Sequence, residues 1–179
     1  MRPRYGLVRD LAEKLVRTHG LTPPVNVREL AERLEFIVRE EEFEPSLSGM
    51  YVVHRRIIAV NRLHSHTRRR FSIAHELGHA LLHVEKVEQQ LFVDENAVHY
   101  RASTNILDWK EIEANRFAAN ILMPEKAMRK IVPAAIEIYD ENLLSLLARQ
   151  FDTSPQAFTA RLAELSLTPE KRKQHLTIS

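Results

Sequence analysis

The chain has 179 residues, of which 44% are hydrophobic and 28% charged, and its formal net charge is only +2. This composition is typical of a globular protein with one sizeable core, and it argues against wholesale disorder and gives no sign of a nucleic-acid binder. The chain contains no cysteine, which excludes disulfides and thiolate metal sites. Because it also lacks a signal-peptide pattern and an apolar run of the ~18 residues that span a bilayer, we expect a cytoplasmic protein.

The first part of the chain predicts two short helices followed by a small sheet. Apolar residues at helical spacing indicate a helix over residues 8–18, and "VNVRELAERL" repeats the pattern with Asn26 as N-cap. The stretches "LEFIVREEEF" and "GMYVVHRRIIAVN" are rich in β-branched and aromatic residues. We therefore predict about three strands, with "EPSLSG" as a connecting loop and "HRR" as a tight turn.

The middle of the chain predicts two longer helices separated by a segment without a clear period. Residues 67–84 and the stretch "DWKEIEANRFAANILMP", which ends at Pro124, have helical patterns. Residues 85–107 predict a long ordered loop or an edge strand. A long loop directly after the candidate active helix is a place where a substrate would bind. The basic cluster "RLHSHTRRR", residues 62–70, is either a solvated helix start or a contact for an acidic partner.

The segment "FSIAHELGHALLH", residues 71–83, carries the chemistry. Residues four apart share a helical face, so His75 and His79 can converge on one metal ion. Glu76 would then serve as the general base that takes a proton from the attacking water. The alternative is a helix that merely contains two histidines. An apolar, core-like segment favours the metal, since buried imidazoles need partners, and Gly78 in mid-helix indicates a close neighbour.

A catalytic zinc ion needs a third protein ligand, which "EIEANRFAAN" can provide. Glu111 and Asn115 lie on one helical face with two alanines that would allow close packing against Gly78. Glu111 would then be the ligand, and Asn115 would accept a hydrogen bond from a ligating imidazole. Glu113 is the alternative ligand, and a solvent-facing carboxylate is the ordinary reading of either glutamate.

These two segments, "RFSIAHELGHALLH" and "EIEANRFAANILMP", resemble the two signature segments of the ImmA/IrrE family of bacterial and phage metallopeptidases. The resemblance spans roughly residues 25–130, including "IIAVN". It implies a gluzincin-type site with His75 and His79 as zinc ligands, Glu76 as catalytic base and a glutamate of 111–113 as third ligand. The Glu-x-x-Ala-Asn pattern of the wider group selects Glu111.

Other candidate site residues are weaker. His83 could line the cleft, but an outer-shell or surface position is the better interpretation. Tyr100 and Arg101 could stabilise an oxyanion, or serve only packing and solubility. We interpret three methionines as core residues: Met50, Met123 and Met128.

Residues 125–167 predict short helices, and residues 168–179 a polar tail. Two apolar stripes flank a short turn before Ser154, the expected N-cap of the second helix, with Pro155 at its first position. This pattern resembles the helix-turn-helix region that follows the peptidase segment in ImmA/IrrE proteins. Its candidate DNA contacts are few: Gln156, Thr159 and Arg161. We therefore favour packing or substrate docking over DNA binding.

The sequence thus predicts an α+β fold with a zincin-like helical core, a small three-stranded sheet and a C-terminal helix-turn-helix-like region. The expected divisions are a metallopeptidase domain at 1–128, a helical region at 129–167 and a tail at 168–179. The expected function is a zinc endopeptidase. The resemblance implies that its partner is a helix-turn-helix transcriptional repressor, cleaved to relieve repression in a stress or mobile-element response. A DNA-binding regulator and a toxin–antitoxin component built on the same fold are the alternatives.

Overall fold

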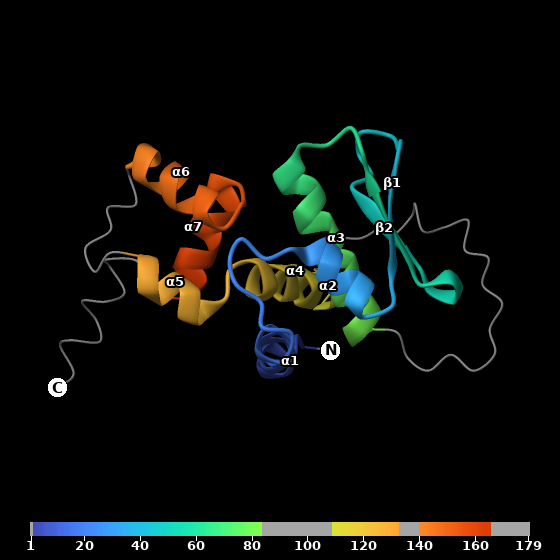
Figure 1. Ribbon diagram of the computed structural model, residues 1–179, viewed down its shortest axis with the longest axis horizontal. Helices are drawn as coiled ribbons and strands as arrows, with labels where there is room; N and C mark the ends of the chain where they lie inside the picture. Colours follow the sequence, from blue (N-terminus) through green and yellow to red (C-terminus); the bar gives the residue numbers. More distant parts are fainter. Residues whose placement is uncertain (1, 84–108, 133–139, 166–179) are drawn as a thin grey trace.

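The computed structural model describes residues 2–83, 109–132 and 140–165. Within these residues the fold is α+β, as predicted, with seven helices and one three-stranded sheet. The predicted segment 85–107, with Tyr100 and Arg101, and the predicted tail 168–179 lie outside the described residues. In Figure 1 the sheet lies at one end, helices α5–α7 lie at the other, and α3 and α4 lie between them.

The two N-terminal helices are confirmed. Helix α1 (Tyr5–Thr18) buries an apolar stripe, and α2 (Val27–Arg33) begins after Asn26, whose side chain accepts a hydrogen bond from the backbone N–H of Glu29. This bond satisfies one of the backbone donors that a helix start leaves unpaired. Helix α1 packs against α4 (Trp109–Leu122), and α2 packs against α3 (His66–Leu82).

The three predicted strands form one sheet in the order β1–β3–β2. Strand β1 (Ile37–Glu41) is parallel to β3 (Ile57–Asn61), and β2 (Gly49–Val52) is antiparallel to it. The predicted turn at "HRR" is a 3₁₀ turn, η1 (Val53–Arg55), followed by Arg56 in a left-handed conformation with φ of 51°. Because β3 lies in the middle of the sheet, β2 is an edge strand. The chain continues from β3 into α3.

Asn61 fixes the path of the loop that leads into β2. It is fully buried at the end of β3, and its amide donates hydrogen bonds to three backbone carbonyls of the loop, those of Phe43, Glu44 and Leu47, at 2.9–3.2 Å. A buried amide with this many partners stabilises a single loop conformation. The loop therefore delivers Gly49 to a defined place at the start of β2.

Helices α3 and α4 approach each other closely at Gly78. Helix α3 begins after Ser65, whose hydroxyl accepts a hydrogen bond from the backbone N–H of Arg68. A Cβ atom at position 78 would lie 3.1–3.2 Å from atoms of Ala114 and Phe117 of α4. The mid-helix glycine therefore admits a close neighbour, as predicted, and the distance between the two helices depends on it.

The C-terminal part consists of three short helices that share the hydrophobic core of the rest of the chain. These are α5 (Glu125–Ile131), α6 (Glu141–Gln150) and α7 (Pro155–Glu164). Helix α7 has the predicted N-cap, Ser154, and the predicted first residue, Pro155. The predicted apolar stripes are largely buried, including Leu147, Phe151 and Phe158. One continuous cluster of buried residues runs from α1 to α7, and the predicted boundary at 128 falls inside α5.

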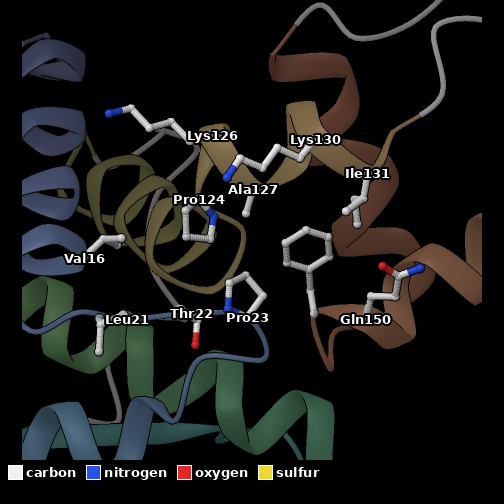
Figure 2. Close-up of a pocket in the computed structure, with 11 residues that line it drawn as sticks. Val16, Leu21, Thr22, Pro23, Pro124, Lys126, Ala127, Lys130, Ile131 and Gln150 are labelled. Carbon is white, nitrogen blue, oxygen red and sulfur yellow. The ribbon is translucent and has the colours of Figure 1, made fainter.

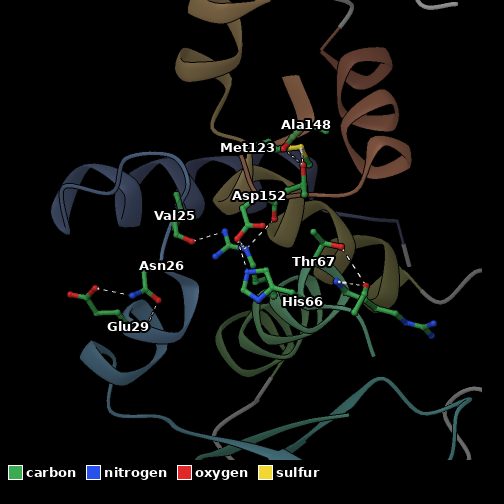
Figure 3. Close-up of polar contacts among 12 residues, drawn as sticks. Val25, Asn26, Glu29, His66, Thr67, Met123, Ala148 and Asp152 are labelled. Carbon is green, nitrogen blue, oxygen red and sulfur yellow. Dashed lines mark hydrogen bonds and ion pairs between the residues drawn. The ribbon is translucent and has the colours of Figure 1, made fainter. Parts of the chain in front are cut away.

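The turn between α6 and α7 is bound to the start of α3, as Figure 3 shows. Asp152 has a left-handed conformation there, and its carboxylate contacts His66 at 2.7 Å and Arg70 at 3.2 Å. Arg70 also donates hydrogen bonds to the carbonyls of Asp152 and Val25. Arg62 and Arg69 of the basic cluster pair with glutamates of the sheet region. Much of the basic cluster therefore lies around the start of α3 and forms ion pairs with other residues of the chain.

Arg161 corrects a sequence-based interpretation. The helical pattern predicts an exposed candidate for DNA or substrate contact at this position, but Arg161 is only 2% exposed. Its guanidinium donates hydrogen bonds to the Met123 carbonyl and the Asn120 side chain, and forms an ion pair with Glu164. Helical spacing could not reveal this, since the position is covered by α4, a distant part of the chain. Of the three predicted core methionines, Met123 and Met128 are fully buried, whereas Met50 is half-buried.

Among the described residues, no helix is both long enough and apolar enough to cross a bilayer. A hollow of about 380 Å³ opens on the surface between α1, the segment before α2, α5 and the end of α6. Figure 2 shows its largely apolar lining, from which Lys126 and Lys130 of α5 rise. None of its lining residues is one of the candidate site residues on α3 and α4: His75, Glu76, His79, Glu111 and Glu113.

Candidate metal centre

Three side chains from α3 and α4 converge at one point: His75, His79 and Glu111. The Nε2 atoms of the two histidines are 3.0 Å apart. The carboxylate of Glu111 lies 3.3 Å from Nε2 of His75 and 2.9 Å from Nε2 of His79. One ligand atom from each residue therefore faces the other two, as in a group that could hold a metal ion.

The spacing of these atoms fits a zinc ion. Bonds of ~2.0–2.1 Å to nitrogen and oxygen in a tetrahedral arrangement put neighbouring ligand atoms roughly 3.3 Å apart. The Nε2–Nε2 separation of 3.0 Å is close to that value, and so are the distances of 3.3 Å from His75 to Oε2 and of 2.9 Å from His79 to Oε1 of Glu111. Two imidazoles with one carboxylate form a ligand set of catalytic zinc sites, which leave a fourth position for water or substrate.

A second contact orients the imidazole of His75. Its Nδ1 atom lies 2.9 Å from Oδ1 of Asn115, one helical turn after Glu111. An amide oxygen only accepts hydrogen bonds, so Nδ1 of His75 carries the proton. In the neutral ring that a metal ligand requires, the lone pair is then on Nε2. In the metal-free protein Nε2 also carries a proton, which it donates to Glu111, and a bound metal would replace that proton.

The electrostatics of the cluster favour a bound cation. Hydrogen bonds from His75 and His79 lower the pKa of Glu111 far below its ordinary value and outweigh the opposing effect of burial. Burial lowers the pKa of His75, but the neighbouring carboxylates of Glu111 and Glu76 outweigh it, and the net direction is upward. Glu111 is therefore ionised at neutral pH, and the two imidazoles lie in a locally negative environment that attracts positive charge.

Glu76 lies next to the cluster, between α3 and the edge strand. It is 7% exposed, and a Cβ atom at position 49 would be 3.3 Å from its Cγ and 3.4 Å from its Oε1. Only a glycine at position 49 leaves the carboxylate this space. Gly49 is thus a site residue that sequence analysis missed, although a glycine at the start of a strand is a known sign of close approach.

Glu113, the alternative third ligand, lies apart from the cluster. Its fully buried carboxylate forms an ion pair with Arg4 at 2.7 Å and contacts Nε2 of His83 at 3.1 Å. Burial raises the pKa of Glu113, but hydrogen bonds from Arg4 and His83 outweigh it and lower the pKa to about 2. His83 in turn contacts Nδ1 of His79, so its position is in an outer shell, as we expected.

A groove of about 560 Å³ lies between the first turns of α3 and the start of α7. The ring of Phe71 lines it and is 6.5 Å, between centroids, from the ring of His75. Among the described residues of the lining, Arg68 is the one that carries a charge, and Gln156 and Ala157 of α7 also line the groove. The groove therefore lies one helical turn before the cluster along α3.

Comparison with known proteins supports a specific family. A peptidase family whose description is "IrrE N-terminal-like domain" matches residues 31–163, which include all the residues of the cluster. The chain belongs to the ImmA/IrrE family of metallopeptidases.

Two individual proteins are also similar to this chain. The chain is 28% identical over 123 residues to "Uncharacterized immunity region protein 2" of Bacillus phage phi105, covering 68% of this chain and 71% of the phage protein. Its fold is similar, with a TM-score of 0.60 and 18% identity, to a Mycobacterium tuberculosis transcriptional regulator. That match covers 87% of this chain and 46% of the regulator, so the chain spans less than half of the regulator's length.

Arg4 is the second residue of this ImmA/IrrE site that sequence analysis missed. It lies outside the matched segment, before α1, and is 109 residues from Glu113 in the chain. Its guanidinium also lies 5.3 Å from the ring centroid of Trp109. No local signal identifies such a contact, because a lone arginine ahead of a helix is ordinarily a solvated charge.

Proposed function

We propose that this ImmA/IrrE chain is a zinc endopeptidase in which His75, His79 and Glu111 hold the metal and Glu76 is the general base. The observation that carries the proposal is the convergence of three ligand atoms within 4.8 Å of one another, from two helices that pack closely at Gly78. The buried Glu76 carboxylate on the same helix supports hydrolysis rather than structural metal binding, since a structural site needs no base.

Zinc bound to these residues would supply a Lewis acid and a nucleophilic water at neutral pH. Glu76 would accept one proton from the water as its oxygen attacks the peptide carbonyl carbon. It would then donate that proton to the nitrogen of the leaving amine as the C–N bond breaks. A carboxylate confined between α3 and Gly49 has few alternative positions, which favours this transfer.

The edge strand and the groove beside Phe71 are the proposed contacts of the substrate. Strand β2 lies at the edge of the sheet, so an extended peptide could add to it as a further strand and pass next to Glu76. The groove would receive a further segment of a protein substrate against Phe71 and Ala157. Arg68, the one charge among the described residues of the lining, favours neutral or acidic residues in that segment.

The proposed substrate is a helix-turn-helix transcriptional repressor, whose cleavage would relieve repression in a stress or mobile-element response. The family and the phage relative, which is by its name an immunity region protein, support a regulatory role. Such a role needs cleavage at one site rather than general degradation, and docking on α7 would contribute to that selectivity.

The alternatives are a DNA-binding regulator and a toxin–antitoxin component on the same fold. The burial of Arg161 weighs against DNA binding by α7, since it removes the one cation among the three candidate contacts and leaves the uncharged Gln156 and Thr159. No observation on the described residues favours the toxin reading over the peptidase.

Glu76→Gln tests the peptidase proposal. The variant should keep its metal and its fold, because no proposed ligand changes. It should lose cleavage of the proposed helix-turn-helix repressor by at least about 10²-fold, because an amide cannot accept the proton. The measurement is gel and mass analysis of the repressor after incubation with each protein and zinc.

Arg68→Glu provides a second arm of the same assay, with Arg9→Glu on the exposed surface of α1 as matched control. The groove proposal expects slower repressor cleavage by Arg68→Glu, with unchanged cleavage of a short peptide across the scissile bond.

Undiminished cleavage by Glu76→Gln would refute Glu76 as the base. An intact repressor together with degraded casein would refute the specific substrate.

A further inference from the structure

The outer shell of the proposed metal site extends from His79 to the N-terminal segment. Nδ1 of His79 lies 3.0 Å from Nδ1 of His83, and Nε2 of His83 lies 3.1 Å from Oε2 of Glu113. Arg4 donates to Glu113 with its backbone N–H at 2.5 Å and with its guanidinium at 2.7 Å and 3.1 Å. Four residues from three segments therefore form one continuous path of hydrogen bonds.

The chemistry of the groups fixes the direction of these bonds. The ionised Glu113 carboxylate only accepts, so the ring nitrogen that contacts it, Nε2 of His83, carries a proton. In neutral His83 the other nitrogen, Nδ1, is then an acceptor. The proton between the two Nδ1 atoms therefore belongs to His79. In the neutral ring that a metal ligand requires, the lone pair of His79 is then on Nε2, the atom that faces His75 and Glu111.

We propose that Arg4, Glu113 and His83 are positioning residues that hold the imidazole of His79 in the tautomer and orientation needed to bind zinc. This inference rests on the proposed metal site and adds to it the residues, outside the ligand set, that determine its affinity. We call these three residues the positioning chain. Its effect on His79 parallels that of Asn115 on His75, so each histidine ligand has a hydrogen-bond acceptor behind it.

Burial and packing make the positioning chain rigid. The side chain of Glu113 is fully buried and that of His83 is 5% exposed. The Trp109 ring packs edge-on against the His83 ring, with 5.5 Å between centroids, and lies under the guanidinium of Arg4. Groups held in this way lose little further freedom when metal binds, which is how outer partners raise the affinity of a ligand.

Zinc titration of metal-free protein, in competition with a chromophoric chelator, tests the inference. His83→Phe fills the space without an acceptor, and it should weaken zinc binding about 10–100-fold. His83→Gln offers a carbonyl to His79 and an N–H to Glu113, so it should recover most of that loss. Arg4→Met should weaken binding about tenfold through Glu113. His54→Phe, at an exposed histidine of η1, is the matched control and should bind zinc as the wild type does.

A second measurement needs no variant. In long-range ¹H–¹⁵N spectra of the zinc-loaded wild type, His79 should carry its proton on Nδ1 and His83 on Nε2. The reverse assignment, or equal zinc affinity of His83→Phe and wild type, would overturn the inference. Failure of the proposed function itself is distinguishable, because wild type and His75→Ala would then bind zinc equally weakly. Circular dichroism of each variant separates loss of folding from loss of affinity.

Discussion

At the scale of single residues, the site depends on small side chains as much as on the reactive ones. Gly49 carries no chemistry, yet it provides the space that the Glu76 carboxylate occupies. A Cβ atom at position 49 would also lie 3.1 Å from the carbonyl oxygen of Ala59 in β3. Strand β2 therefore has little room to shift away from Glu76. The proposed general base is therefore positioned by a backbone contact with the sheet.

Gly49→Ala tests this dependence. The added methyl group should displace the Glu76 carboxylate by a few tenths of an ångström and lower the cleavage rate about tenfold, given that a 1 Å misplacement can cost about 10²-fold. Zinc content should not change, because no ligand is touched. Cleavage rate, zinc content and thermal unfolding should be measured together, with Gly6→Ala as control, since a Cβ at position 6 would meet no atom within 4 Å. Full activity of a folded Gly49→Ala protein would be inconsistent with this role.

At the scale of elements, the contact between α3 and α4 determines the geometry of the proposed metal site. Two of the proposed ligands are on α3 and the third is on α4, so their separation follows the distance between these helices. Gly78 costs ~1 kcal/mol relative to alanine in a helix interior, but it permits this distance.

Gly78→Val should therefore destabilise the fold and weaken the metal site together. The branched side chain would overlap Phe117 and Ala114, and overpacking of this kind costs about 1–3 kcal/mol. Chemical denaturation gives the stability and zinc titration gives the affinity. A variant that is destabilised but binds zinc as tightly as the wild type would contradict the coupling between helix separation and ligand geometry.

Most elements could be predicted from the sequence because their signals are local. Helix starts at Asn26 and Ser154 follow from capping signals. The helical spacing of Glu111 and Asn115, together with a mid-helix glycine, predicts a close helix contact and a hydrogen bond from a ligating imidazole to Asn115. The parallel pairing of β1 with β3, the contact of Arg4 with Glu113 and the burial of Arg161 could not be predicted in this way. Each joins segments far apart in the chain, and periodicity does not specify which surfaces meet.

At the scale of the whole molecule, Arg161 joins the C-terminal helices to α4. A buried arginine that bonds Asn120 and Met123 is a structural group, so it cannot serve as a docking charge. Arg161→Leu should cost about 3 kcal/mol of unfolding free energy, because its buried partners would be left without a donor. Arg129→Leu, which removes an exposed i,i+4 ion pair, should cost at most about 0.5 kcal/mol.

Denaturant unfolding of both variants checks this prediction. The outcome against it would be an Arg161→Leu protein as stable as the wild type that selectively loses substrate binding. That result would restore the docking role that the sequence suggested, and would imply that α7 moves away from α4 when the substrate binds.

The central claim, that two helices bring His75, His79 and Glu111 together to hold one zinc ion, is tested most directly by metal analysis of the purified protein. The wild type should contain close to one zinc per chain, and Glu113→Gln should retain most of it, since Glu113 is not a ligand. His75→Ala and Glu111→Gln should lose most of their zinc while keeping their helical content. Equal zinc content in the wild type, His75→Ala and Glu111→Gln would contradict the proposed site.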